Sequence, residues 1–368
     1  MSAPPLLFPN LGAEEGEAWR RMARHPRVRD AARSWRALFA ADARLVGADE
    51  PLDGALGEPF AGGASGPALA LAGARDVLVA WLATDEAAAL AAREGVPLAG
   101  PPPRAVAAVH DKAFALEAAR AAGLLPAELA ETAFALAPGE LVDADTAKCR
   151  VEGAVARWPA ELRTRFVLKP RLGTSGRGRL AGRAGRLDRD ALAAALARFR
   201  SRAGVVVEPW LEREADLSAQ LDVRGPDDVQ LLATFVQVLT PEGVPRGHRA
   251  RIGADGRAES ATPWDAELRL AAGAVARAAA AAGYRGPCGV DAFAFRGAGG
   301  AARFRAVVEL NARFTSGTGA AGWVARALRG GLIEPGSELY LGAAPAPFDA
   351  HRVELFAAPG ESALFVAR

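Results

Sequence analysis

The sequence predicts a mixed α/β protein of roughly two to three domains. Three observations lead to this prediction. The chain has 368 residues, and a domain usually holds roughly 100 to 200. Strand-like and helix-like segments alternate through about the first 105 residues, a pattern typical of a parallel sheet. Near the other end, two apolar segments rich in Val and Phe flank a glycine-rich break at residues 297–300, which predicts a β-hairpin.

Composition is that of an ordinary globular protein. Hydrophobic residues make up 51% and charged residues 24%, and the net charge is only +2, which argues against nucleic acid as the main partner. Cys149 and Cys288 lie far apart and in no CxxC pair, so neither a disulfide framework nor a zinc site is expected. Because no signal peptide or membrane-spanning apolar run is visible, we expect a soluble, cytoplasmic protein that does not enter membranes.

The first part of the chain is expected to form the parallel αβ unit. Three apolar segments are strand candidates: residues 6–8, 43–47 and 77–82. A helix is expected from about Trp19 to Trp35, with a break at Pro26. No GxGxxG sequence follows a strand, so a dinucleotide-binding fingerprint is absent. The stiff segment at residues 101–104 marks the boundary with the next domain.

The next helix has a cation in its first turn. Asp111 suits the N-cap and Gly123 the position after the last turn, which places Lys112 where the helix dipole disfavours positive charge. A lysine at this position is explained if it reaches an anion that the helix N-terminus also attracts. The alternative is a solvated surface lysine.

A strand that ends in Lys169 precedes a glycine-rich loop at residues 171–178. Its backbone N–H groups and hydroxyls can turn toward one anion, and the residues concerned are Gly173, Thr174, Ser175 and Gly176. The loop is not a Walker A sequence. A glycine-rich loop alone is more often a hairpin turn, but the lysine on the preceding strand favours an anion site.

A β-branched strand then breaks at Pro209. Because proline lacks an N–H, the extended segment leaves carbonyls able to accept from a purine amine. Glu208 could accept the same donor, Asp216 could bind ribose hydroxyls, and Trp210 and Leu211 could line an apolar slot. The alternative is a core strand that runs into a polar loop.

Two further strands are expected at residues 217–223 and 229–239, followed by a polar loop at residues 243–251. This loop carries three basic side chains close together: His248, Arg249 and Arg251. They form either a solvated loop or a clamp for a substrate or phosphate. A long helix, about residues 264–282, then leads to the hairpin.

The hairpin carries the candidate metal ligands. If it is symmetric about Gly300, Asp291 and Glu309 face each other with Cβ atoms roughly 5 Å apart, and Asn311 emerges on the face of Glu309. Two facing carboxylates and an amide favour a cation, and an all-oxygen set favours magnesium or manganese over zinc. The alternative is a solvated edge hairpin with incidental acids. Residues 314–320 are expected to form a flexible turn before a short helix.

Taken in this order, the features resemble the ATP-grasp superfamily over about residues 105–330. The most specific part is the Glu-x-Asn-x-Arg sequence from Glu309 to Arg313 at the end of a strand. The resemblance implies two α+β subdomains that grip ATP, at residues 106–204 and 205–368. It also implies a preceding Rossmann-like parallel αβ domain at residues 1–105.

The resemblance also implies roles for individual residues. Lys112 and Lys169 should contact ATP phosphates, and the loop should close over them. Adenine should lie along Glu208, Pro209, Trp210 and Leu211. The ribose should lie at Asp216 or at its rival Glu214, because Asp216 stands one residue later than the usual acid. Magnesium or manganese should bind Asp291, Glu309 and Asn311.

The sequence departs from the pattern in two further places. Pro209 stands where many relatives have a second lysine. Gly289 stands where D-alanine–D-alanine ligases have an arginine, which shifts the role of steadying the phosphoryl group or acyl phosphate to Arg313 or Arg251.

The function implied by the resemblance is an ATP- and magnesium-dependent carboxylate–amine ligase that forms an acyl phosphate and then an amide. Its substrates would be small molecules, with an amino acid or small peptide favoured. The alternatives are a kinase or carboxylase of the same fold and a non-catalytic nucleotide-binding module. The resemblance also allows a homodimer, because dimers are common in the superfamily.

Overall fold

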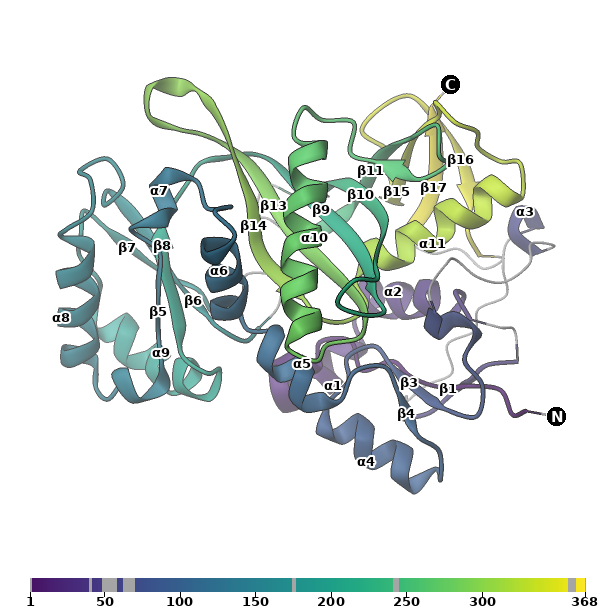
Figure 1. Cartoon of the computed structure of the whole chain (residues 1–368), viewed down its shortest axis with the longest axis horizontal. Coiled ribbons are helices and arrows are strands. Elements are labelled where there is room, and N and C mark those ends of the chain that lie inside the picture. Colours follow the sequence, from purple (N-terminus) through teal and green to yellow (C-terminus); the bar gives the residue numbers. More distant parts are fainter. Residues whose placement is uncertain are drawn as a thin grey trace.

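The computed structural model describes residues 2–39, 42–47, 58–61, 70–173, 177–240, 245–356 and 362–367. Three β-sheets organise this part of the chain (Figure 1). In that view the N-terminal sheet lies at the lower right and a four-stranded sheet lies at the left. A nine-stranded sheet fills the centre and the upper right.

The N-terminal sheet has four parallel strands in the order β2-β1-β3-β4. They are β1 (Leu6–Phe8), β2 (Arg44–Leu45), β3 (Leu78–Ala80) and β4 (Leu98–Ala99). Their direction confirms the expected parallel sheet. The break at Pro26 is also confirmed, since α1 (Trp19–Ala23) ends before it and α2 (Pro26–Arg36) begins on it. The other helices of this region are η1 (Ala13–Ala18), α3 (Glu58–Ala61), η2 (Ala70–Gly73) and α4 (Asp85–Arg93).

Helices α5 (Pro103–Val109) and α6 (Lys112–Ala121) lead out of this region. The expected ends of α6 are confirmed. Asp111 Oδ1 accepts a hydrogen bond from the Ala113 N–H at 2.8 Å, and Gly123 has a φ of +67°, in the left-handed region that favours glycine. One side of α6 packs against the large sheet, so Lys112 begins a helix that is fixed in place.

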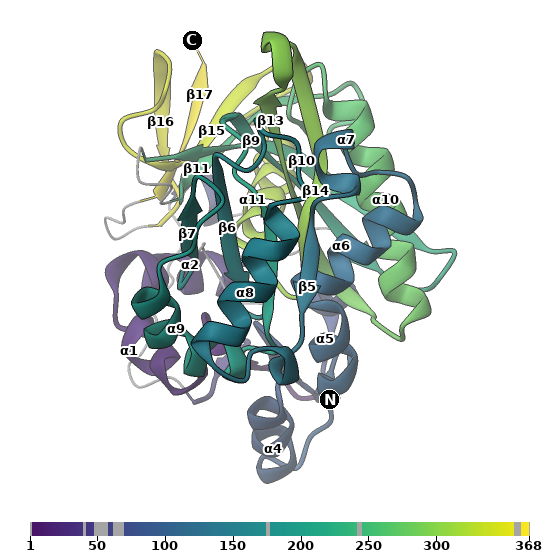
Figure 2. The same ribbon diagram turned by 90° about the vertical axis from the view of Figure 1, so that its left-hand side faces the viewer.

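The four-stranded sheet has the order β5-β8-β6-β7, with every pair of neighbours antiparallel. Its strands are β5 (Phe134–Leu136), β6 (Arg165–Pro170), β7 (Leu180–Arg183) and β8 (Val205–Pro209). Helices α8 (Ala144–Val155) and α9 (Arg189–Ser201) cover one face and bury Phe166 and Leu168 (Figure 2). Because side chains alternate, Lys169 lies on the opposite face. Two short helices, α7 (Ala127–Ala130) and η3 (Pro138–Glu140), flank β5.

The expected subdomain boundary at residues 204 and 205 therefore needs correction. Strand β8 hydrogen-bonds to β5 and β6, so it belongs to the four-stranded sheet. The chain passes to the large sheet only after Pro209.

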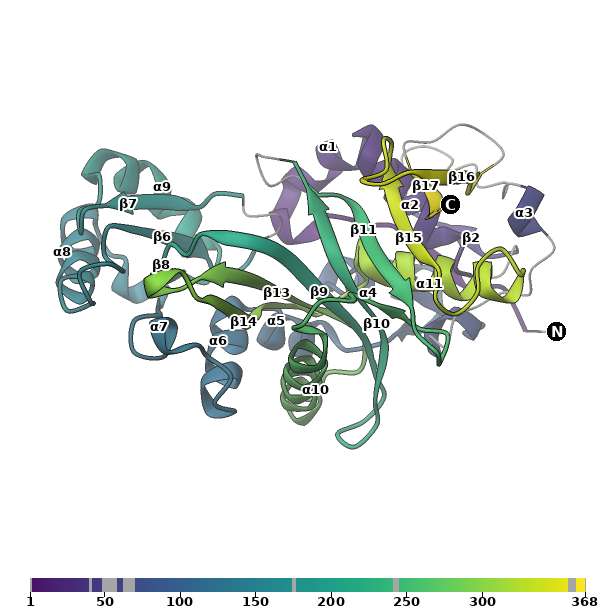
Figure 3. The same cartoon turned by 90° about the horizontal axis from the view of Figure 1, so that it is seen from above.

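The large sheet is antiparallel, in the order β14-β13-β9-β10-β11-β15-β17-β16, with β12 beside β11. Its strands are β9 (Arg213–Val223), β10 (Val229–Leu239), β11 (Pro245–Ile252), β12 (Ala258–Glu259), β13 (Gly286–Arg296), β14 (Ala302–Asn311), β15 (Glu338–Ala343), β16 (Ala350–Glu354) and β17 (Ser362–Ala367). The turn of the central hairpin holds η4 (Ala298–Gly300). Helix α10 (Asp265–Ala281) covers one face (Figure 3) and α11 (Ser316–Arg329) packs on the other.

We call the α11 side the site face, defined by Phe235, His248 and Asp291. Asp291 lies in register with Ser218, and Ser218 lies in register with Phe235. His248 packs against the Phe235 ring and its Nε2 lies 3.0 Å from Ser316 Oγ, at the start of α11. None of the helices in the described ranges is long and apolar enough to cross a membrane.

Two expected loops are regular structure instead. Within the segment expected as a polar loop, residues 245–251 belong to β11, while residues 243 and 244 lie outside the described residues. In β11 buried His248 and Ala250 alternate with exposed Arg249 and Arg251, as in an antiparallel strand with one covered face. The segment expected as a flexible turn begins helix α11. Its glycines suit close packing, since a Cβ on Gly317 would lie 2.5 Å from Gln220 Nε2.

Candidate active site

The hairpin of β13 and β14 presents its acids as expected. Asp291 pairs directly with Glu309, and Gly289 with Asn311, in the antiparallel register. The predicted facing of Asp291 and Glu309 is therefore confirmed. The register shifts immediately beyond, between Asp291 and Phe293, and such irregularities are frequent beside active sites.

The two facing carboxyl groups differ in charge state. Burial and the neighbouring Glu309 raise the pKa of Asp291 to about 7. Burial would raise the pKa of Glu309 too, but Lys112, whose Nζ lies 3.0 Å from Glu309 Oε2, helps to lower it to about 2. Two adjacent carboxyl groups resist simultaneous ionisation, so the pair retains a proton up to about neutral pH.

This group of side chains fits a hard divalent ion. Asp291 accepts from Gln237 Nε2 at 2.8 Å and from Asn311 Nδ2 at 3.0 Å. Within the described ranges no three His, Cys, Asp or Glu residues form a metal cluster, so the candidate set is two carboxylates and an amide. Magnesium and manganese accept such a set, because they bind few protein oxygens and complete their coordination with water and phosphate.

The raised pKa of Asp291 predicts how stability depends on pH. In the unfolded chain an aspartate loses its proton near pH 4, roughly, whereas folded Asp291 keeps it to about pH 7. Raising the pH between these values therefore favours unfolding through this group. We expect Asp291→Asn to gain thermal stability relative to the wild type as pH rises from 5 to 7, measured in EDTA.

A matched control for this prediction is Asp227→Asn, an exposed aspartate in the turn between β9 and β10. It should track the wild type at every pH. A difference between Asp291→Asn and the wild type that does not change with pH would contradict the proposed charge state.

Lys112 joins the hairpin to the glycine-rich loop. Its Nζ donates to the carbonyl of Gly173 at 2.8 Å and pairs with Glu309, while its backbone N–H donates to the carbonyl of Arg171 at 3.1 Å. Gly173 has a φ of +147°. The other predicted loop residues, Thr174, Ser175 and Gly176, lie outside the described residues. The start of α6 therefore holds a cation and a helix N-terminus beside the loop expected to bind phosphate.

Lys169 and Glu208 form a buried ionic cluster with Arg305. Lys169 Nζ contacts Glu208 Oε1, which also accepts from Arg305 Nη1 at 2.8 Å. Burial would raise the pKa of Glu208, but Arg305 and Lys169 hold it far below its usual range. Burial lowers the pKa of Lys169 to about 8. The oxygen Glu208 Oε2 is buried without a hydrogen-bond partner in the described part of the chain, so it is placed to accept from a ligand.

Arg305→Leu should destabilise the protein strongly. The change leaves the buried carboxylate of Glu208, 4% exposed, with Lys169 as its remaining cation in this cluster. Breaking a buried ion pair in this way costs about 3 to 5 kcal/mol of unfolding free energy. Chemical denaturation would measure the loss. Arg303→Leu is the control, because this half-exposed arginine two residues earlier pairs loosely with Glu128 at 3.4 Å and should matter little. Equal losses for the two variants would contradict the role of the buried cluster.

The rest of the predicted hinge lies at the end of β8. Pro209 is its last residue, and the Trp210 N–H donates to the carbonyl of Arg165 at 2.9 Å. The Trp210 ring lies 4.8 Å from the guanidinium of Arg165 and 5.3 Å from that of Arg179. Leu211 packs against the apolar cluster under α6. Trp210 is therefore held by two cations, an arrangement that the sequence did not indicate.

Both candidates for the ribose are ion-paired. Asp216 pairs with Arg213 at 2.6 Å, and Glu214 pairs with Arg296 at 2.6 Å. Asp216 lies in register with Gln237, the residue that also binds Asp291. Asp216 is thus the acid that adjoins the carboxylate pair.

The two candidate catalytic arginines lie in different places. Arg313 Nη2 donates to Asn311 Oδ1 at 3.0 Å, so it adjoins the candidate metal ligands. Arg251 does not. His248 pairs with Gln237 on the site face, and Arg251, three residues further along β11, points to the opposite face. The expectation that Arg251 shares the role of Arg313 is therefore corrected.

Sequence reasoning missed four residues that adjoin the predicted ones: Glu14, His110, Gln237 and Arg305. They come from different segments and share no motif spacing. The amino-acid composition, however, did single out the lysines of the site. The chain has 45 basic residues but only three lysines, Lys112, Lys148 and Lys169. Two of these three, Lys112 and Lys169, lie at the site. Each carries a compact ammonium group, a point charge that the planar guanidinium of arginine does not replace.

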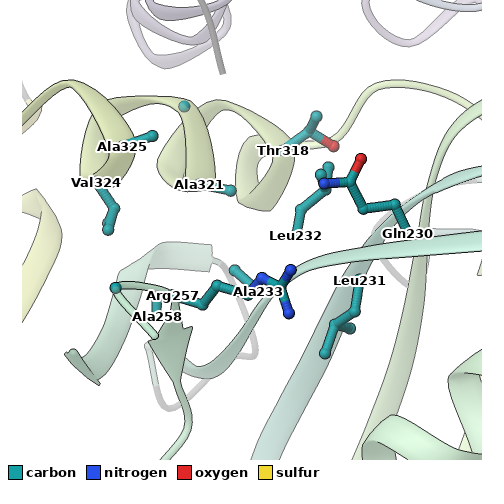
Figure 4. Close-up of a pocket in the computed structure, with 12 residues that line it drawn as sticks. Gln230, Leu231, Leu232, Ala233, Arg257, Ala258, Thr318, Ala321, Val324 and Ala325 are labelled. Carbon is teal, nitrogen blue, oxygen red and sulfur yellow. The ribbon is translucent and has the colours of Figure 1, made fainter. Parts of the chain in front are cut away.

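A separate small pocket of about 120 Å³ lies between β10, α11 and the turn before β12 (Figure 4). Its lining is mainly aliphatic, and its polar members are Gln230, Arg257 and Thr318. No predicted site residue lines it, so its position gives no support for a role in the site described above.

The comparisons with known proteins are informative at the level of fold. No family model and no curated protein matches the sequence. The biotin carboxylase of Campylobacter jejuni, in a β-γ-ATP complex, matches with a TM-score of 0.52 at 13% identity, over 99% of this chain and 86% of that chain. The biotin carboxylase domain of Hydrogenobacter thermophilus 2-oxoglutarate carboxylase, with MgADP, ADP and bicarbonate, matches with a TM-score of 0.52 at 15% identity, over 100% and 86%.

A ligase shows the same similarity. The D-alanyl-alanine synthetase A of Vibrio cholerae matches with a TM-score of 0.50 at 14% identity, over 84% of this chain and 89% of that chain. These neighbours are ATP-grasp enzymes. The resemblance that the sequence motifs indicated is therefore confirmed for the architecture, and the chain has the ATP-grasp fold.

Proposed function

We propose that the protein is an ATP- and magnesium-dependent ligase that activates a carboxylate as an acyl phosphate and joins it to an amine. The observation that carries the proposal is the convergence of Asp291 and Glu309 with Lys112 from a distant segment. Lys169 also acts electrostatically on Glu309. Phosphoryl transfer needs charge neutralisation and alignment more than covalent help, and such a cluster supplies both.

In this proposal ATP lies between the four-stranded sheet and the site face of the large sheet. Lys112 and Lys169 contact its phosphates, and the loop at residues 173–178 closes over them. Its adenine lies along residues 208–211, where Glu208 Oε2 lacks a partner within the described chain. Asp216 accepts from the ribose, with Glu214 as the alternative. The N-terminal parallel sheet serves as the Rossmann-like domain that precedes such a fold.

Magnesium or manganese would be held by Asp291, Glu309 and Asn311. Once bound, the ion would neutralise charge on the β- and γ-phosphates. Asn311 would have to turn its amide oxygen from Arg313 toward the ion. Arg313 would then be available to orient the transferred phosphoryl group or the acyl phosphate.

The reaction would proceed by two displacements. A substrate carboxylate oxygen attacks the γ-phosphorus while the bond to the β-γ bridging oxygen breaks, and ADP leaves with that electron pair. An amine then attacks the acyl carbon, phosphate leaves and the amine loses a proton. Neither step requires a nucleophilic side chain, so the chain's part is to bind and align. We infer small-molecule substrates, with an amino acid or small peptide favoured.

Carboxylation is the second candidate. Two carboxylase neighbours match 99% and 100% of this chain, whereas the Vibrio cholerae ligase matches 84%. In this alternative a bicarbonate oxygen attacks the γ-phosphorus and ADP leaves. An acceptor nucleophile then takes the carboxyl group from the carboxyphosphate, phosphate leaves and the acceptor loses a proton.

A screen of phosphate release tests both candidates. Purified protein with ATP and magnesium would be offered amino acids, small carboxylates and bicarbonate, alone and with amines. Release that requires an acid and an amine together supports the ligase. Release with bicarbonate alone supports the carboxylase. A protein that binds ATP but releases no phosphate in any of these mixtures contradicts both candidates.

A further inference from the structure

The N-terminal region sends one loop into the candidate active site. Residues 9–12 follow β1, and the buried side chain of Asn10 fixes them to the end of β3. Asn10 Nδ2 donates to the carbonyl of Leu82 at 2.8 Å, and Asn10 Oδ1 accepts from the Leu82 N–H at 3.0 Å. Gly12, with a φ of +86°, turns the chain into η1, which carries Glu14. The position of Glu14 is thus set by the parallel sheet.

The carboxylate of Glu14 lies on Arg313. Glu14 Oε1 is 2.9 Å from Arg313 Nε, and the two side chains are only 3% and 11% exposed. The other two guanidinium nitrogens are also engaged, because Nη1 donates to the carbonyl of Phe314 and Nη2 to Asn311 Oδ1, each at 3.0 Å. Two hydrogen bonds and one ion pair therefore hold the guanidinium, and the contacts with Glu14 and Phe314 remain when Asn311 turns toward the ion as proposed above. Of these three, Glu14 is the charged partner and comes from another domain.

The surroundings of Glu14 leave buried polar atoms without hydrogen bonds, an arrangement that does not favour stability. Glu14 Oε2 is buried without a hydrogen-bond partner in the described part of the chain. The same is true of Nε2 of His110, whose Nδ1 accepts from the Ala312 N–H at 3.1 Å. Such unsatisfied atoms are rare in folded proteins and occur at functional sites. A carboxylate that served only to join two domains would be expected to satisfy both of its oxygens.

The same loop is also joined to the four-stranded sheet's side of the molecule, beside the start of the glycine-rich loop at residues 171–173. Arg202 Nη1 donates to the carbonyl of Glu14 at 2.7 Å, and Arg202 Nη2 lies 2.9 Å from Glu15 Oε2. The backbone carbonyl of Arg202 in turn accepts a hydrogen bond from the N–H of Leu172 at 3.1 Å, and Leu172 immediately precedes Gly173. Glu14 therefore lies where the N-terminal loop, the start of the glycine-rich loop and the end of the hairpin meet.

We propose that Glu14 is a positioning residue of the N-terminal domain that holds the guanidinium of Arg313 in the orientation required for phosphoryl transfer. The proposal rests on the function proposed above. It predicts that Glu14 acts through Arg313, so that its removal lowers the rate of the chemical step and leaves nucleotide affinity intact. It also assigns the N-terminal domain a direct part in catalysis.

A double-mutant cycle tests this proposal. Glu14→Gln keeps the shape and removes the charge, and we expect it to lower kcat for phosphate release by about 10- to 100-fold, the range typical of residues that orient a functional group. KM for ATP and the affinity for a non-hydrolysable ATP analogue with magnesium should stay at wild-type values. In an Arg313→Ala background, Glu14→Gln should cause no further loss, because the two residues act as one unit. Glu14→Asp should restore part of kcat.

Glu86→Gln is the matched control, since this N-terminal carboxylate is part of a solvent-exposed pair with Arg20. It should leave kcat and affinity unchanged. Multiplied losses in the double variant, or a parallel loss of analogue affinity and thermal stability in Glu14→Gln alone, would overturn the positioning role while leaving the proposed function in place. A wild-type protein that releases no phosphate with any substrate would instead overturn the proposed function, and the positioning role with it.

Discussion

Replacing Glu309 with glutamine is expected to lower ATP-dependent phosphate release by about 100- to 1,000-fold, the size of loss found when one charge-stabilising group is removed from a reaction centre. Glu309 is the carboxylate whose pKa is lowered to about 2, so it is charged at neutral pH and available to a divalent ion. Because the change also removes the charged partner of Lys112, thermal unfolding of the variant would be measured alongside its rates. Initial rates measured across a magnesium titration would quantify the loss.

The control for this variant is Glu338→Gln. Glu338 lies on β15 of the same sheet, and half of its side chain is exposed. It should retain wild-type turnover. If Glu309→Gln also turned over ATP like the wild type at saturating magnesium, the assignment of the metal ligands would be wrong.

Lys169→Met should weaken ATP binding by about 10- to 100-fold, since a hydrogen bond to a charged group is worth about 1.5 to 3 kcal/mol. Burial lowers the pKa of Lys169 to about 8, so the wild-type affinity should itself fall as pH rises from 7 to 9. The variant should lack this pH dependence. Calorimetric titration with a non-hydrolysable ATP analogue at several pH values would measure both effects.

Lys148→Met provides the comparison for Lys169. Lys148 is the third lysine of the chain, and on α8 it pairs with Glu152 and donates to the carbonyl of Leu187 at 2.7 Å. Its replacement should lower stability but leave ATP affinity unchanged. Equal affinities for Lys169→Met and the wild type would show that the nucleotide does not use this face of the four-stranded sheet.

Local rules were sufficient for the part of the site that lies on one hairpin or one helix end. The alternation of strand residues placed Asp291 opposite Glu309, and capping preferences placed Lys112 at the start of α6. Both placements depend on residues close in sequence or related by a single turn. The roles of these residues remain predictions.

Contacts between distant segments could not be predicted in this way. Glu14 meets Arg313 across almost the whole chain, and Arg305 reaches Glu208 from another sheet. These pairs join segments that belong to different sheets, and no local sequence pattern encodes how the sheets pack together.

The two misassigned loops have a related cause. Strand β11 looked polar because Arg249 and Arg251 face outward, and the start of α11 looked flexible because of its glycines. In the fold, β10 and β15 supply hydrogen-bonding partners for β11. Gly317 allows the close approach of α11 to Gln220. Tertiary pairing and packing thus outweighed local propensity.

The most direct test is a crystal structure with manganese and a non-hydrolysable ATP analogue, using the anomalous signal of the metal. We predict a manganese peak within coordination distance of carboxylate oxygens of Asp291 and Glu309, with the analogue's terminal phosphates on its far side and within reach of Lys112 and Lys169. A metal bound elsewhere, or a nucleotide whose phosphates lie away from the hairpin, would contradict the account.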